Sequence, residues 1–197
     1  MALVKTKARG ISLTDNFDFT GTVTGTGSNI KEKLVMLCDG NNYTVSSGTY
    51  TSQNVTALQI LTTSYEDVTG STISYTPPSG SVCVIYEFCY TANIYNDASS
   101  ISHFKFFIDS DEVVHQRMNL GGTTYQDLET IRCVIPIGGS ADTNTGRLAS
   151  WTSAKTLKLQ ARGYDTASEP KLHSSTYWDG NAGLNFHVPS LTITALG

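Results

Sequence analysis

Histidines are the first residues to consider for chemistry, because three or four of them together could hold a transition metal. In this chain they lie in separate predicted elements, and none forms an HxH or HExxH motif. The sequence therefore predicts no metal site, and nothing in it calls for another cofactor. The four histidines are His103, His115, His173 and His187.

Two groups of carboxylates could also do chemistry. The run Asp109–Glu112 could offer oxygen ligands to Ca²⁺, but it lacks the glycine and distal glutamate of an EF-hand loop and is interpreted as an acidic hairpin tip. Asp165, Glu169 and Asp179 could include a pair for glycoside cleavage, at a separation that only the fold decides. No GxSxG elbow, phosphate-binding glycine loop or activated cysteine accompanies them, so the chain is not expected to be an enzyme and no catalytic residue is assigned.

A late segment, residues 172–181, places two large aromatic side chains among hydrogen-bonding residues. Proteins use this mixture to stack on sugars or to anchor an interface. His173, Tyr177 and Trp178 are therefore the candidate residues for binding a ligand or a partner. The alternative interpretation is a packed loop in which the aromatic residues have a structural role only.

Four cysteines, Cys38, Cys83, Cys89 and Cys133, lie within or beside apolar strand patterns and show no CxxC spacing. They are too few to staple a chain of 197 residues, so they are interpreted as reduced, buried packing residues. Cys83 and Cys89 fall on one face of one predicted strand. They are about 20 Å apart at roughly 3.3 Å per residue, which excludes a disulfide between them.

The composition argues against two classes of partner. Charged residues make up 15% of the chain, against roughly 25% in an average globular protein, and the net charge is -4. Apart from the short run Lys5–Arg9, basic residues are scattered, so nucleic acid is not an expected partner. No apolar run approaches the roughly 20 residues of a membrane span, and no signal peptide is expected. The chain is therefore expected to be soluble and not exported by the Sec route.

β-Strands must position these side chains, because Thr, Val, Ile, Tyr and Phe favour a pleated surface and 17 glycines supply turns. The strongest pattern is a central strand from Ser81 to Asn93, apolar on both faces. One face of this strand carries Val82, Val84, Tyr86, Phe88 and Tyr90, and the other carries Cys83, Ile85, Glu87, Cys89 and Thr91. The second face should be covered by another sheet or subunit, and Glu87 should need a partner.

About eight to ten strands are predicted in all, with no helix of any length and no internal repeat. This pattern favours an all-β jelly-roll sandwich over residues 31–197 and disfavours a propeller or solenoid. Beyond the central strand, the predicted strands are residues 34–38, 43–45, 55–61, 71–75, 103–108, 113–120, 127–137, 154–163 and 188–196.

Residues 1–30 alternate apolar and small polar side chains and then become rich in glycine and threonine. An extended strand with free edges is stable only when another chain satisfies its backbone groups. The segment is therefore predicted to be an extended N-terminal arm that pairs with a neighbour, with Phe17, Phe19 and Val23 as candidate contacts. A disordered tail is the alternative.

Four stretches of the sequence share a pattern with known proteins: Asp67–Gly80 followed by Val84–Glu87, Lys7–Gly25, His103–Asp111 and Thr152–Arg162. Together they cover most of the chain and resemble a family of marine bacteriophage virion proteins described as structural, decoration or tail proteins. The resemblance implies a jelly roll like the globular heads of tumour necrosis factor and complement, which usually form trimers. It transfers no catalytic residue and does not specify a place in the particle.

The resulting hypothesis is a non-enzymatic virion protein, a homotrimeric capsid decoration or cement protein that binds the major capsid protein and stabilises the shell. It would be assembled in the host bacterial cytoplasm, and a trimer would bury the outward face around Ile85. The alternative is the receptor-binding knob of a head or tail fibre, attached to a fibre or tail protein and recognising host-surface glycans. A carbohydrate-binding module or hydrolase unrelated to phage is the third possibility.

Overall fold

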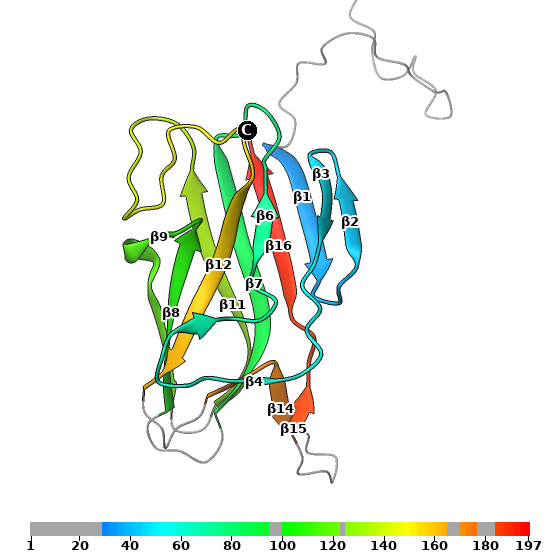
Figure 1. Ribbon diagram of the computed structural model, residues 1–197, viewed down its shortest axis with the longest axis vertical. Helices are drawn as coiled ribbons and strands as arrows, with labels where there is room; N and C mark the ends of the chain where they lie inside the picture. Colours follow the sequence, from blue (N-terminus) through cyan, green and yellow to red (C-terminus); the bar gives the residue numbers. More distant parts are fainter. Residues whose placement is uncertain (1–28, 95–99, 123–124, 165–169, 177–183) are drawn as a thin grey trace, which may run out of the picture.

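Two antiparallel sheets packed face to face form the molecule (Figure 1). The computed structural model describes residues 29–94, 100–122, 125–164, 170–176 and 184–197. Four long strands form the first sheet, in the spatial order β1 (Ile30–Leu37), β16 (Ser190–Leu196), β7 (Cys83–Ile94) and β11 (Tyr125–Pro136). Two short strands, β13 (Lys171–Leu172) and β4 (Gln59–Ile60), continue this sheet beside the far end of β7.

The second sheet is built around β12 (Lys155–Gly163), which pairs along its length with β8 (Ser100–Ile108). Its remaining strands are β10 (Met118–Gly122) and β9 (Asp111–Glu112) beside β8, and β5 (Glu66–Asp67) and β6 (Ile73–Tyr75) beside β12. Two small hairpins stand apart, β2 (Asn42–Val45) with β3 (Gly48–Thr51) and β14 (Ser174–Thr176) with β15 (Leu184–Phe186).

The chain changes sheet at most of the connections between its longer strands. It passes from β6 to β7, from β7 to β8, from β10 to β11, from β11 to β12 and from β12 towards β16, each time crossing to the opposite sheet. Only antiparallel pairs join the named strands. This crossing pattern is that of a jelly roll, so the predicted all-β fold class is confirmed.

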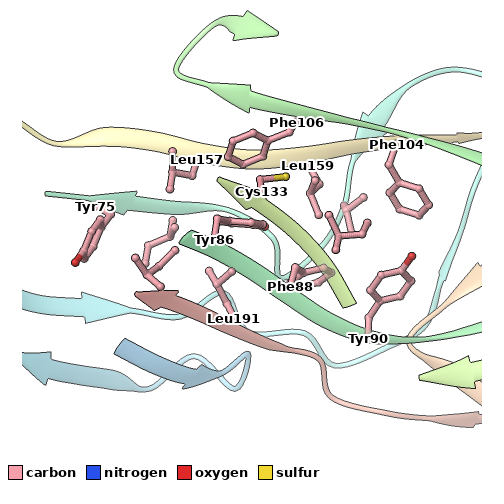
Figure 2. Close-up of a cluster of buried hydrophobic side chains, with 14 of the residues drawn as sticks. Tyr75, Tyr86, Phe88, Tyr90, Phe104, Phe106, Cys133, Leu157, Leu159 and Leu191 are labelled. Carbon is pink, nitrogen blue, oxygen red and sulfur yellow. The ribbon is translucent and has the colours of Figure 1, made fainter. Parts of the chain in front are cut away.

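The core lies between the sheets, where every second residue of the long strands is buried (Figure 2). Tyr86 of β7 packs on Phe106 of β8 with ring centres 5.1 Å apart, and Tyr90 packs on Phe104 at 5.9 Å. The predicted inward face of β7 is confirmed for the four residues from Val84 to Tyr90 that occupy it. The buried side chains facing them from the second sheet include Phe104, Phe106, Ile108, Leu157, Leu159 and Ala161.

Val82 is the exception on this face, because it is 55% exposed instead of buried. The strand begins one residue later, at Cys83, after a turn in which Gly80 adopts a φ of 75°. Val82 bonds through its backbone to Leu196 and Ile137 at the end of the sandwich. The alternation of apolar residues in the sequence extends to Val82, which lies beyond the end of the core.

Two other strand predictions are corrected. Residues 113–120 are predicted to be one strand, but Val114–Gln116 form a single 3-10 turn before β10. The Gln116 side-chain amide bonds the backbone N and O of Val134, at 3.1 and 2.8 Å. The Gln116 side chain thus makes the hydrogen bonds to β11 that a neighbouring strand would otherwise make. Of residues 55–61, only Gln59–Ile60 are in a strand.

Candidate functional site

The side of the first sheet that points away from the core is called the outer face here. Register across its strands aligns Lys33, Thr194, Ile85 and Val134 in one row. The next row holds Val35, Thr192, Glu87 and Arg132, and the one after it holds Leu37, Ser190, Cys89 and Thr130. Four strands thus present one continuous surface made largely of aliphatic and hydroxyl side chains.

Large apolar side chains on the outer face are exposed to solvent. Val35 is 54% exposed, Leu37 46%, Val134 42% and Leu128, opposite Thr91, 65%. An antiparallel sheet that faces water normally alternates apolar residues inside with polar residues outside. Exposed apolar residues on both outer strands of a solvent-facing sheet, β1 and β11, are typical of a surface that another protein covers.

Few charges interrupt this surface. Glu87 lies beside Arg132 on β11, with Nε and Oε1 3.7 Å apart, so the predicted partner of Glu87 is present. Lys33 is the remaining charged residue in the three rows described above. The hydroxyls of Thr130, Ser190 and Thr192 can exchange hydrogen bonds with water for hydrogen bonds with a partner at little net cost. Removing water from the outer face therefore costs little free energy.

The four cysteines divide between this face and the core, and all are free thiols. Cys38 and Cys133 are buried, and burial raises the pKa of each to about 12, with the Asp39 charge adding to the effect at Cys38. Cys83 and Cys89 are half-buried because they point outward from β7. The interpretation as buried residues is thus confirmed for two cysteines and wrong for the other two.

A buried carboxylate fixes the edge strand that carries Val35 and Leu37. Glu32 of β1 points inward and accepts hydrogen bonds from Ser46 Oγ, Ser47 N and Ser47 Oγ at 2.6 to 2.7 Å. It also accepts one from the Tyr75 hydroxyl of β6 at 2.7 Å. The four bonds tie β1 to the β2–β3 turn and to the second sheet.

Burial acts to raise the pKa of Glu32, but the hydrogen bonds from Ser46, Ser47 and Tyr75 outweigh it, and the pKa is lowered overall. The carboxylate is therefore charged in the folded protein and its charge is distributed over four donors. Sequence reasoning missed this group. The signal was an acidic residue at an inward position of the alternating strand that continues with Leu34 and Met36.

His173 is the candidate site residue whose surroundings the structure describes, and it is fully buried instead of lying on an exposed loop. Its ring lies edge-on to Phe88 and Tyr90, and its Nε2 is 3.1 Å from Thr69 Oγ1. The segment folds this way because Leu172 belongs to β13 and Ser174 to β14, which draws the residue between them inward. His173 is a core residue in this structure.

The other candidate contacts lie outside the described residues. These are Tyr177 and Trp178 of the late segment, Phe17, Phe19 and Val23 of the predicted arm, and the carboxylates Asp165, Glu169 and Asp179.

The acidic run after β8 is held by protein groups. Asp109, with a φ of 56°, accepts hydrogen bonds from Lys155 Nζ and from the Thr156 backbone, both at 2.8 Å. Glu112 pairs with Lys105 and with Arg117. Within the described ranges, no three His, Cys, Asp or Glu side chains gather in a way that could hold a metal ion.

The fold and the outer face together define an all-β sandwich with a solvent-facing apolar sheet surface. No protein-family model matches the chain, and a search of curated proteins found no match either. No helix among the described residues is long and apolar enough to cross a membrane.

Proposed function

We propose that this chain is a non-enzymatic phage virion protein, a homotrimeric capsid decoration protein that binds the major capsid protein and stabilises the shell. The observation that carries the proposal is the outer face, where Val35, Leu37, Leu128 and Val134 are exposed on a sheet with few charges. Such a surface suits a protein whose role is to be covered by other copies. The sequence resemblance to virion proteins supplies the kind of assembly.

A ring of identical subunits explains how one such face is buried. In a closed ring each subunit uses two different surfaces, and the ring leaves no unpaired copy of either. A stable interface buries about 800 Å² per partner, and apolar burial contributes roughly 25 cal/mol per Å². The jelly roll of the resembled family favours three subunits. The two half-buried thiols, Cys83 and Cys89, would be sheltered in such an interface.

The two ends of the described chain support a role for the N-terminal segment. Gly197 N donates to Asn29 O at 2.8 Å, so the first and last described residues lie together. Figure 1 shows the C-terminus at the same end of the sandwich as the turn before β7. Residues 1–28 start from this end and, fully extended, could reach at most about 90 to 100 Å, enough to contact several neighbouring subunits.

Cryo-electron microscopy of phage particles purified from cells that produce the chain tests the proposal. The expected result is trimers distributed over the shell, in hundreds of copies, with the outer face of each subunit covered by a different surface of its neighbour. A few copies at a vertex or on the tail would instead establish the fibre-knob alternative. Particles from which the chain is absent would overturn both assignments.

A second experiment isolates the N-terminal segment. A variant lacking residues 1–28 keeps β1 intact, because that strand begins at Ile30. We expect the variant to fold and to form trimers but to lose most of its occupancy on capsids. Full occupancy of the truncated protein would show that the segment does not attach it to the shell.

A further inference from the structure

The geometry points to a binding site for an acidic sugar, one bearing a carboxylate or a sulfate, on the opposite sheet. The site is a hollow of about 420 Å³ on the solvent side of β8, β10 and β12. The inference does not depend on the proposed place of the protein in a virion. The residues lining the hollow are Tyr65, Ile101, His103, Arg117, Asn119, Arg162, Gly163 and Tyr164.

Strand register builds the floor of this hollow. His103 of β8 stands directly opposite Asn119 of β10 and directly opposite Arg162 of β12. Directly opposite residues on neighbouring strands point to the same side of a sheet, within about 5.5 Å of one another. An amide, an imidazole and a guanidinium therefore line up across three strands, and no residue from the core is needed to form the site.

Positive charge is concentrated here in a chain whose net charge is -4. Lys105 and Arg117 share a single carboxylate, that of Glu112. Arg162 makes no ion pair with any carboxylate among the described residues; its guanidinium instead lies 5.1 Å from the centre of the Tyr65 ring. The residues that line the hollow thus include two arginines, Arg117 and Arg162, and no carboxylate.

The central histidine responds to this charge. Burial lowers the pKa of His103 most, and the positive charges of Arg117, Arg162 and Lys105 lower it further. The His103 ring is also fixed in place by a hydrogen bond with the Tyr65 hydroxyl. A guanidinium that forms no ion pair among the described residues, held beside a fixed ring, suits an anion with two oxygens in one plane, such as a carboxylate.

The aromatic residues supply what a sugar needs beyond its charge. Tyr164 follows β12 and is 65% exposed, so its ring face is free to stack on a pyranose ring. Tyr65 is held between Lys105, whose Nζ is 4.2 Å from the ring centre, and Arg162, and forms a rigid wall. Asn119 is exposed and can bond sugar hydroxyls through both its donor and its acceptor atoms. Charge, stacking and amide bonding together distinguish a sugar acid from a simple anion.

The hollow is separate from the outer face and from the C-terminal end of the sandwich. It lies where β8 begins and β12 ends, at the opposite end of the sandwich from the C-terminus (Figure 1). The outer face and the end from which residues 1–28 depart are thus both separate from this site. A subunit attached through either of them would present the hollow to its surroundings.

Isothermal titration of the full chain with short oligosaccharides tests the inference. The probes are trigalacturonic acid, a sulfated galactose trisaccharide, neutral maltotriose and hexaglutamate, which carries carboxylates without a sugar. We expect one or both acidic trisaccharides to bind and the neutral one not to bind. Failure of both acidic trisaccharides, or equal binding of hexaglutamate, would overturn the site as a sugar site.

Two matched variants locate the binding. Arg162→Gln and Lys158→Gln each remove one positive charge from the solvent side of β12, but Lys158 lies outside the hollow and pairs with Asp67. We expect Arg162→Gln to weaken binding at least 10-fold and Lys158→Gln to change it less than 2-fold. Equal losses would show a response to net charge alone. Tyr164→Ala should weaken binding of the acidic trisaccharide without changing the circular dichroism spectrum of the protein. An unchanged affinity would show that Tyr164 does not stack on the sugar.

Discussion

The two sheets of this sandwich have similar inner faces and opposite outer ones. The first sheet turns Val35, Leu37 and Val134 toward solvent, with one ion pair between Glu87 and Arg132. The second sheet turns ionised and polar side chains outward, and several of them are paired across strands. These include Lys105, Glu112, Arg117, Lys158, Arg162 and Asp67.

The outward-facing sides of the two sheets suit different surroundings, water for the second sheet and a protein partner for the first. Charged side chains keep the second sheet well solvated and hold it apart from other proteins, because removing them from water is costly. The first sheet has no such protection against a partner. In an all-β protein an exposed apolar surface promotes association, so the contrast points to one face that is covered and one that remains free.

The largest expected effect comes from placing a charge on the outer face. Val134→Glu would put a carboxylate in the row with Ile85, where a partner would have to desolvate it. A buried, unpaired charge costs about 3 to 5 kcal/mol, so association should weaken by roughly two to four orders of magnitude. Light scattering coupled to size-exclusion chromatography should show trimers for the parent and monomers for the variant.

Ile101→Glu is the matched control, because Ile101 is an exposed aliphatic residue of β8, on the solvent side of the second sheet. It should remain trimeric at the same concentration. A monomeric parent protein, or trimers of Val134→Glu as stable as those of the parent, would remove the distinction between the two faces.

The second-largest effect is expected on β1, the strand that carries Val35 and Leu37, two of the four exposed apolar residues named above for the outer face. Glu32→Ala would leave the hydroxyls of Ser46 and Tyr75 and the backbone of Ser47 without their acceptor. Unsatisfied buried donors cost about 1 to 3 kcal/mol each, partly relieved by water, so we expect a loss of about 2 to 4 kcal/mol in urea unfolding. Lys33→Ala, at the next and outward-facing position, should stay within about 0.5 kcal/mol. Equal losses for the two variants would show that β1 is not fixed through this carboxylate.

Sequence alone predicted the interior well. Alternation placed Tyr86, Phe88 and Tyr90 on the core face of β7, and the structure has them there, packed against Phe104 and Phe106 of β8. Period-two alternation is a local property, and a one-residue slip would expose the whole apolar set, so it is strongly constrained. The prediction failed at Val82, because nothing in the local pattern marks where the second sheet ends.

The sites depend on contacts that no local pattern contains. Glu32 meets Ser46 14 residues away and Tyr75 43 residues away. His103 faces Asn119 and Arg162 only because of the register of three strands. Strand pairing of this kind depends on the order of strands in the sheet, and local patterns in the sequence do not reveal that order.

Acid sensitivity should arise from the core that both faces share. Burial lowers the pKa of His173 from an ordinary value near 6.5 to about 4, with the hydrogen bond to Thr69 opposing the shift. The unfolded chain takes up this proton first, so stability is complete above pH 6.5 and is lost as the pH falls toward 4. The full loss is about 3 kcal/mol.

His173→Asn isolates that contribution, because asparagine tolerates the φ of 61° at this position and does not titrate. Urea unfolding of both proteins at pH 7, 6, 5 and 4 should give curves that converge as the pH falls. His103 and Glu32 titrate in both proteins, so their contributions cancel in the difference. Parallel curves would show that His173 is not the source of the acid sensitivity.

The smallest effect is expected on the charged face. Lys158 Nζ lies 2.9 Å from Asp67 Oδ1, but about half of the Asp67 side chain is exposed, so water and salt screen the pair. Exposed pairs contribute about 0 to 1 kcal/mol. A double-mutant cycle with Asp67→Asn and Lys158→Met should therefore give a coupling energy below about 1 kcal/mol that falls further in 1 M NaCl. A coupling above about 2 kcal/mol would mean that ion pairs stabilise the solvent side of the second sheet in addition to keeping it hydrated. The two outer faces would then differ in their contribution to stability as well as in their tendency to associate.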